Sequence, residues 1–134
     1  MIPIGTAIQT TGVSNLIATS ISQYASDLSL FWILLIILII TMATTDIINN
    51  AATAVIMAPI SVGIASELGY AIEPFLMVVA VGASCAFLTP IGHQCNTVVM
   101  GPGNYKFTDY WRMGLPMDIL IILASIPMIL FVWT

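Results

Sequence analysis

The stretch 44–59, TTDIINNAATAVIMAP, places two adjacent amide side chains, Asn49 and Asn50, between two long apolar segments that contain no charged residue. Polar side chains inside lipid-compatible sequence are costly unless they have partners or a function. No loop-like cluster separates the two segments. We therefore interpret 28–68 as a re-entrant helical hairpin that enters and leaves the membrane on one side, with the amides at its buried tip. Two complete crossings are the alternative.

A second interruption lies at 89–96, TPIGHQCN, where Pro90 and Gly92 break an apolar run. The polar side chains left at this break are those of His93, Gln94 and Asn96. We predict a broken transmembrane helix over 71–100. Two interrupted helices that each carry amides at membrane depth are typical of ion and solute sites in transporters.

Composition restricts the protein class. Hydrophobic residues make up 60% of the chain and charged residues 6%, whereas soluble domains carry roughly 25% charged residues. This indicates a multi-pass protein of an inner or plasma membrane, with the lipid bilayer as its surroundings. The net charge of −4 provides no basic surface for nucleic acid.

The sequence contains no set of residues that predicts an enzyme. No nucleophile, base and acid occur in a recognisable arrangement, and Cys85 and Cys95 lack the spacing of a structural zinc site. We therefore expect no enzymatic activity and no bound cofactor beyond a coupling ion.

The remaining segments complete a single all-α transmembrane domain over 1–134. Segment 1–26 is apolar but carries several polar residues, so we expect an amphipathic or partial span. Segment 114–134 is the expected last transmembrane helix, and Asp118 near its start is expected to be interfacial.

The charged residues suggest an orientation. Both basic residues, Lys106 and Arg112, fall in the segment 101–113, and acidic residues occupy the other two boundaries. By the positive-inside rule this segment lies in the cytoplasm.

Three stretches together resemble a known transporter family. TDIINNAATAVIMAPI, FLTPIGHQCNTVVMGPGNYKFTDYWRMGLP and the opening MIPIGTAIQTTG are similar to the C-terminal part of the sodium-coupled divalent-anion symporters, the sulfate and dicarboxylate carriers of the ion-transporter superfamily. The resemblance implies one of two inverted repeats, with a re-entrant hairpin, a broken helix and a final helix. It also implies a missing N-terminal repeat, so that the chain is the last third to half of a transporter, and a possible homodimer.

The family's tip motif, Ser-Asn-Thr, falls on Asn49, Asn50 and Ala51. Its Thr-Pro-Pro-Asn motif at the unwound helix falls on the positions 93–96. Only Asn50 and Asn96 match these motifs in residue type, because the flanking hydroxyls and the two prolines are absent.

The two breaks suit the chemistry of a coupling ion and an anion. Sodium is a hard cation, and neutral carbonyl and amide oxygens bind it without preventing its release. Asn50 and Asn96 are the expected side-chain ligands of sodium. The complete expected cation-binding set is Asn49, Asn50, Ala51, Gly92 and Asn96.

An anion needs amide donors, hydroxyl groups and helix N-termini. Helices beginning near Ala51 and Thr97 would direct their positive ends towards the centre. The expected anion-binding set is Asn50, Thr53, His93, Gln94 and Asn96.

Each of these residues also has a structural interpretation. The tip amides could serve interhelical packing, Asn96 could cap a helix that begins at Thr97, and the Thr53 hydroxyl could bond within its own helix. His93 could be structural or carry a proton. Asp46 could sense the cation or be a buried carboxylate with hydrogen-bond partners.

The function that these features favour is secondary active transport, with sodium-coupled uptake of sulfate or a dicarboxylate. One alternative is an arsenite- or proton-coupled antiporter of the same superfamily, which His93 and Asp46 would favour. Another is a small membrane subunit that carries no substrate.

Overall fold

A computed structural model describes residue 7, residues 10–25 and residues 27–133, and the expectations for residues 1–6, 8–9, 26 and 134 lie outside this part. The described residues form helices and connecting segments without a strand, which confirms the predicted all-helical fold. The helices are α2 (Val13–Ala25), α3 (Leu30–Ile47), α4 (Asn50–Leu68), α5 (Ile72–Ser84), α6 (Gln94–Met100) and α7 (Phe107–Trp133).

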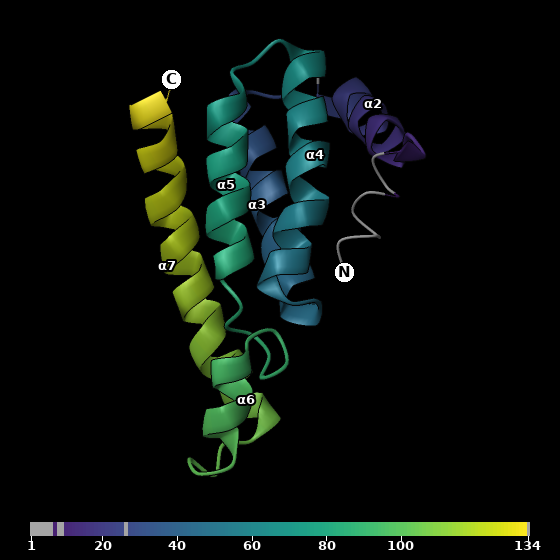
Figure 1. Ribbon diagram of the computed structural model, residues 1–134. Helices are drawn as coiled ribbons and strands as arrows, with labels where there is room; N and C mark the ends of the chain where they lie inside the picture. Colours follow the sequence, from purple (N-terminus) through teal and green to yellow (C-terminus); the bar gives the residue numbers. More distant parts are fainter. Residues whose placement is uncertain (1–6, 8–9, 26, 134) are drawn as a thin grey trace.

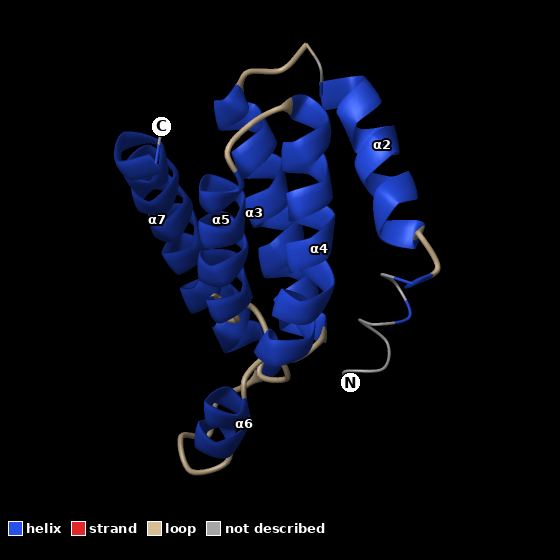
Figure 2. Ribbon diagram, turned by 45° about the horizontal axis from the view of Figure 1, so that its top comes forward, coloured by secondary structure: helices blue, strands red, loops and turns tan. Residues whose placement is uncertain are grey.

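Helices α3, α4 and α5 form the centre of the molecule (Figures 1 and 2). Helix α5 packs against both α3 and α4, α2 covers the outer side of α4, and α7 lies against α5 and α3. Among the described residues, α3, α4 and α7 are long and apolar enough to cross a membrane, and α5 is a shorter apolar helix.

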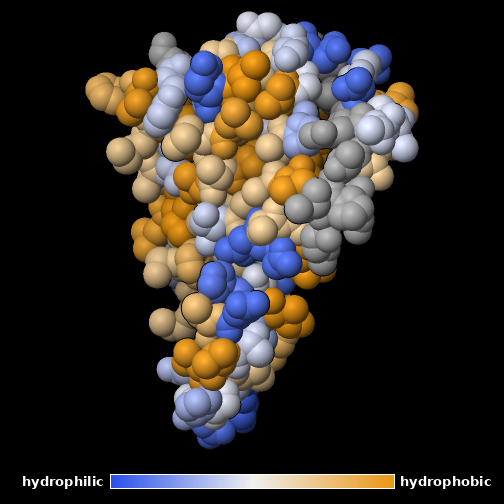
Figure 3. Space-filling view, in the orientation of Figure 1, coloured by the Kyte–Doolittle hydropathy of each residue, from blue (hydrophilic) through white to orange (hydrophobic). Residues whose placement is uncertain are grey.

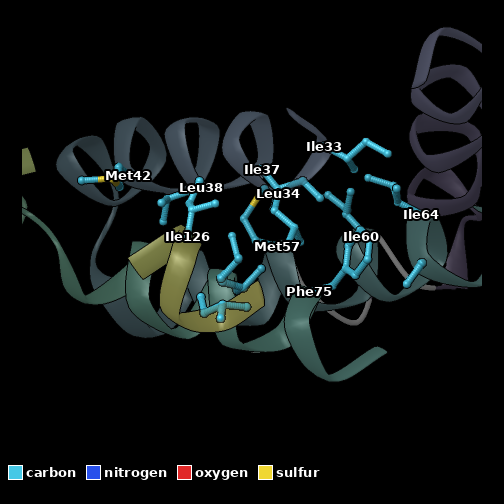
Figure 4. Close-up of a cluster of buried hydrophobic side chains, with 14 of the residues drawn as sticks. Ile33, Leu34, Ile37, Leu38, Met42, Met57, Ile60, Ile64, Phe75 and Ile126 are labelled. Carbon is cyan, nitrogen blue, oxygen red and sulfur yellow. The ribbon is translucent and has the colours of Figure 1, made fainter. Parts of the chain in front are cut away.

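The core consists of side chains from the facing sides of these helices (Figure 4). Leu34 and Leu38 of α3, four residues apart, are completely buried, as is Phe75 of α5. Because lipid is as apolar as these side chains, they hold the helices together through close packing rather than through exclusion of water.

Two extended residues make the turn between α3 and α4. Ile48 has φ −108° and ψ 160°, and Asn49 has φ −71° and ψ 158°. The side chain of Asn49 then caps α4, because its Oδ1 accepts a hydrogen bond from the Ala52 N–H at 2.8 Å. The two helices run antiparallel with this turn at one end (Figure 1).

Helix α7 begins at Phe107, seven residues before the expected start at 114. The Lys106 N–H donates to the Asp109 carboxylate at 2.8 Å, and this capping contact starts the helix early. As a result Asp118 lies roughly 16 Å along the helix from its start and is only 8% exposed. Asp118 is therefore buried against the bundle, and its depth in a membrane stays a prediction.

The start of α7 and the whole of α6 extend beyond the α3–α4 turn (Figure 1). Gly114, about 10 Å along α7, lies against the connection after α5: a Cβ added at Gly114 would come within 2.5 Å of the Phe87 carbonyl oxygen. Close backbone contact therefore fixes α7 against the break between α5 and α6.

We expect Gly114→Ala to lower the stability of the protein by about 1–3 kcal/mol, the usual cost of overpacking. The added methyl group would meet backbone atoms of Phe87, which cannot rotate away. Thermal unfolding in detergent measures the effect. Gly101→Ala is the matched control, because a Cβ there meets no atom within 4 Å. Equal melting temperatures for the two variants would contradict the contact.

Candidate functional site

The end of α3 and the break 85–93 are joined by hydrogen bonds. The Leu88 N–H donates to Asp46 Oδ1 at 3.2 Å, and the Thr89 hydroxyl donates to the Asp46 carbonyl at 2.6 Å. Gly92 also lies here, because a Cβ built on it would come within 2.9 Å of the Thr45 carbonyl oxygen. The two predicted helix interruptions therefore meet in space.

Thr45 connects this junction to the hairpin tip. Its side chain is completely buried, and its hydroxyl lies 3.0 Å from Asn50 Oδ1 and 2.9 Å from the Ala83 carbonyl oxygen. Asn50 is the first residue of α4, so the contact ties the start of α4 to the end of α3 and to the last turn of α5.

Asn96 holds the two sides of the break together. Its Nδ2 donates to the carbonyl oxygens of Ala86 at 2.8 Å and Thr89 at 3.2 Å. Its amide hydrogens are thus both engaged, and Oδ1 is the atom left to bind another group. The Tyr110 hydroxyl donates to the Asn96 backbone carbonyl at 2.7 Å and fixes this residue against α7.

The alternative in which Asn96 caps a helix at Thr97 is wrong. Helix α6 begins at Gln94, and His93 caps it by accepting a hydrogen bond from the Cys95 N–H at Nδ1, at 3.2 Å. Thr97 instead uses its hydroxyl to donate to the Pro90 carbonyl at 2.6 Å. Asn96 therefore lies inside α6, with its side chain directed to the break.

The structure does not gather the whole expected anion-binding set at one point. The side chains of His93 and Gln94 are exposed, and no hydrogen bond in the described part of the chain joins either to the hairpin tip. Thr53 is completely buried in the first turn of α4, and its hydroxyl has no hydrogen-bond partner among the described residues, so it does not bond within its own helix.

Two of the expected cation ligands at the tip have different surroundings. Asn49 uses its side-chain oxygen to cap α4, and Ala51 is exposed. The residues that the hydrogen bonds and close contacts bring together are Thr45, Asp46, Asn50, Thr89, Gly92 and Asn96.

Sequence reasoning missed Thr45 and Thr89. Thr41 and Thr44, in the same helix as Thr45, donate to carbonyls one turn earlier in α3, which is the ordinary behaviour of a helical threonine. Only the packing of α5 against α3 distinguishes Thr45 from them. The available signal was the position of both hydroxyls directly beside an interruption.

The junction opens on cavities and on a polar surface. Asn96 and Tyr110 border two cavities, of about 310 Å³ and about 190 Å³, between α6 and the beginning of α7. On the face shown in Figure 3, hydrophilic residues gather at the level of the α3–α4 turn, between apolar surfaces above and below. The polar junction therefore lies part-way along an otherwise apolar bundle.

A family described as the sodium:sulfate symporter transmembrane region matches residues 1–134. An uncharacterized transporter of Synechocystis is 37% identical over 99% of the chain and 22% of its own length. The chain is 28% identical, over 91% of its length, to sodium/sulfate cotransporter 2 of Chlamydomonas reinhardtii, of which it covers 14%. The chain is also 29% identical, over 86% of its length, to sodium-dependent high-affinity dicarboxylate transporter 3 of Caenorhabditis elegans. It covers 20% of that protein.

The chain thus spans about a fifth or less of the length of these relatives. The matched family consists of membrane transporters, and with the three candidate spans this confirms a multi-pass membrane protein that is not an enzyme. The chain belongs to the sodium:sulfate symporter family.

Proposed function

We propose that the chain is the C-terminal part of a secondary transporter that couples the uptake of sulfate or a dicarboxylate to sodium. The observation that carries the proposal is the junction itself. Asn96 is held by two hydrogen bonds with its Oδ1 left available, beside the hairpin whose first helical residue is Asn50. Neutral oxygens fixed between interrupted helices suit a cation that must bind and leave again.

The arrangement of the helices supports a re-entrant hairpin. Gly114 contacts Leu88, and Leu88 donates to Asp46 near the end of α3. The α3–α4 turn is therefore level with a point about 10 Å along α7. If the bilayer covers α7 from its start at Phe107, the tip with Asn50 lies inside the bilayer rather than at its surface.

Two helix starts near the junction support a neighbouring anion site. Helix α4 has 19 residues and begins at Asn50, so its positive end is directed towards the junction. His93 and Gln94 lie exposed at the start of α6 and can donate to an anion that approaches from the solvent side. The relatives named as a sulfate cotransporter and a dicarboxylate transporter suggest the two substrate classes.

We expect the native full-length protein in liposomes to accumulate sulfate or succinate when sodium is higher outside than inside. The experiment compares an inward sodium gradient with a choline gradient of the same size, and with an inward proton gradient without sodium. Residues 1–134 alone should not transport, because such a site lies at the interface of two repeats. Uptake driven by the proton gradient and indifferent to sodium would contradict the proposal and favour a proton-coupled carrier.

A further inference from the structure

Helix α7 buries an acid that the proposed transport site does not use. Asp118 is 8% exposed, and no group in the part of the chain that the structure describes forms a hydrogen bond with its Oδ1. It lies within the apolar length of a helix that is a candidate membrane span. An unpaired carboxylate in such surroundings is strongly unfavourable, and acids at this depth normally have a charged partner or a function.

A second acid in the same region is also incompletely bonded. Asp46, near the end of α3, is 5% exposed. Its Oδ1 accepts from the Leu88 N–H at 3.2 Å, but its Oδ2 has no hydrogen-bond partner. Each acid thus retains one buried oxygen that nothing in the described part of the chain satisfies.

The two acids flank the same backbone segment. A Cβ added at Gly114 would lie 3.0 Å from the Leu88 nitrogen, and that nitrogen donates to Asp46. Asp118 lies one helical turn after Gly114, on the same face of α7. Both acids therefore lie beside the same backbone contact, at which Leu88 meets α7.

The charge at this place is not balanced by the described residues. Both basic side chains are exposed: Lys106 directly precedes α7, and Arg112 lies in its second turn. Two negative groups in a medium of low dielectric constant lose their hydration and repel each other more strongly than in water. A bound positive ion removes both costs.

We propose that Asp46 and Asp118 together hold one monovalent cation where α3, the break and α7 meet, in addition to the cation at Asn50 and Asn96. Each acid contributes its unsatisfied oxygen, and the Phe87 carbonyl, which lies against Gly114, is placed to contribute a third. Oxygen ligands of this kind suit a hard cation. The identification of the ion as sodium rests on the proposed function.

A cavity of about 190 Å³ reaches the backbone contact beside these two acids. Phe87, Gly114 and Met117 line it together with Asn96. It therefore extends from the predicted transport site at Asn96 to the turn of α7 that precedes Asp118.

The test uses the native full-length protein with Asp118→Asn and, as the matched control, Asp27→Asn, which removes an exposed acid outside the helices. Thermal unfolding is followed in choline and in sodium, and bound radioactive sodium is counted at saturation. In choline, Asp118→Asn should melt above the wild type, because it removes an uncompensated buried charge. The rise in melting temperature from choline to sodium should be smaller for Asp118→Asn than for the wild type. This variant should bind one sodium ion fewer per chain, whereas Asp27→Asn should behave as the wild type does.

If Asp118→Asn binds as many sodium ions per chain as the wild type, the inference is wrong. It is also wrong if the melting temperature of the wild type depends on pH and not on sodium, because the two acids then share a proton. Asp118→Ser, with a smaller side chain, is the second variant. If neither variant folds, the carboxylate serves the fold rather than an ion, and the inference is wrong. Sodium-driven uptake by the wild type remains the separate test of the proposed function, so the two can fail independently.

Discussion

Asn50→Ala and Asn96→Ala are each expected to raise the sodium concentration for half-maximal uptake roughly 5- to 150-fold in the full-length protein. Asn50 and Asn96 are half-buried. Loss of one such polar ligand costs on the order of 1–3 kcal/mol, and about 1.4 kcal/mol corresponds to a factor of ten. The Asn96 side chain is fixed by two carbonyl acceptors, and that of Asn50 by the Thr45 hydroxyl. Uptake of labelled substrate as a function of sodium concentration measures the effect.

Asn49→Ala is the internal control for this prediction. Its side-chain oxygen caps α4 at Ala52, so its removal should cost about 0.5–2 kcal/mol of stability with a smaller change in the sodium response. Gln94→Ala, at an exposed position, should alter the response to the anion instead. If Asn50→Ala and Asn96→Ala express normally and keep the wild-type sodium dependence, the two amides serve packing and the site assignment is wrong.

Gly92→Ala is expected to reduce uptake at saturating sodium roughly tenfold to a hundredfold. A Cβ at this position would lie 2.8 Å from the Ala86 Cβ, 2.9 Å from the Thr45 carbonyl oxygen and 3.1 Å from the Asp46 Cα. Two of these neighbours are backbone atoms, so the break must move away from the end of α3. Overpacking of this kind costs about 1–3 kcal/mol, and the displacement would separate groups that must act together.

Initial uptake rates of Gly92→Ala and Gly101→Ala, each corrected for the amount of protein in the liposomes, provide the measurement. Gly101 has no atom within 4 Å of an added Cβ and lies in a helical backbone conformation that alanine adopts readily. Its substitution should leave uptake unchanged. Wild-type rates in Gly92→Ala would show that the break and the hairpin do not need this close contact.

The sequence predicts the helical class and the existence of both interruptions, although the second begins at residue 85 rather than at the predicted residue 89. Polar residues are so unfavourable in lipid-compatible sequence that Asn50 and Asn96 stand out without any knowledge of the fold. Pro90 and Gly92 mark the second interruption in the same way. These features depend only on neighbouring residues, so they can be recognised in a single sequence.

The features that were missed depend on contacts between distant segments. Whether Thr45 bonds within α3 or to Ala83 is decided by the packing of α5, and the burial of Asp118 is decided by which face of α7 meets the bundle. The start of α7 at Phe107 was not predicted for a different reason. Polar and aromatic residues such as those after Lys106 occur both in loops and in helices at a membrane interface.

We expect one cation to bind between Asn50 and Asn96, where the hairpin tip meets the broken helix. An experimental structure of the full-length protein, determined once in sodium chloride and once in choline chloride, tests it most directly. We expect density for an ion in sodium alone, in contact with Asn50 Oδ1 and Asn96 Oδ1. Identical side-chain positions in the two structures, with no ion beside either amide, would contradict the account.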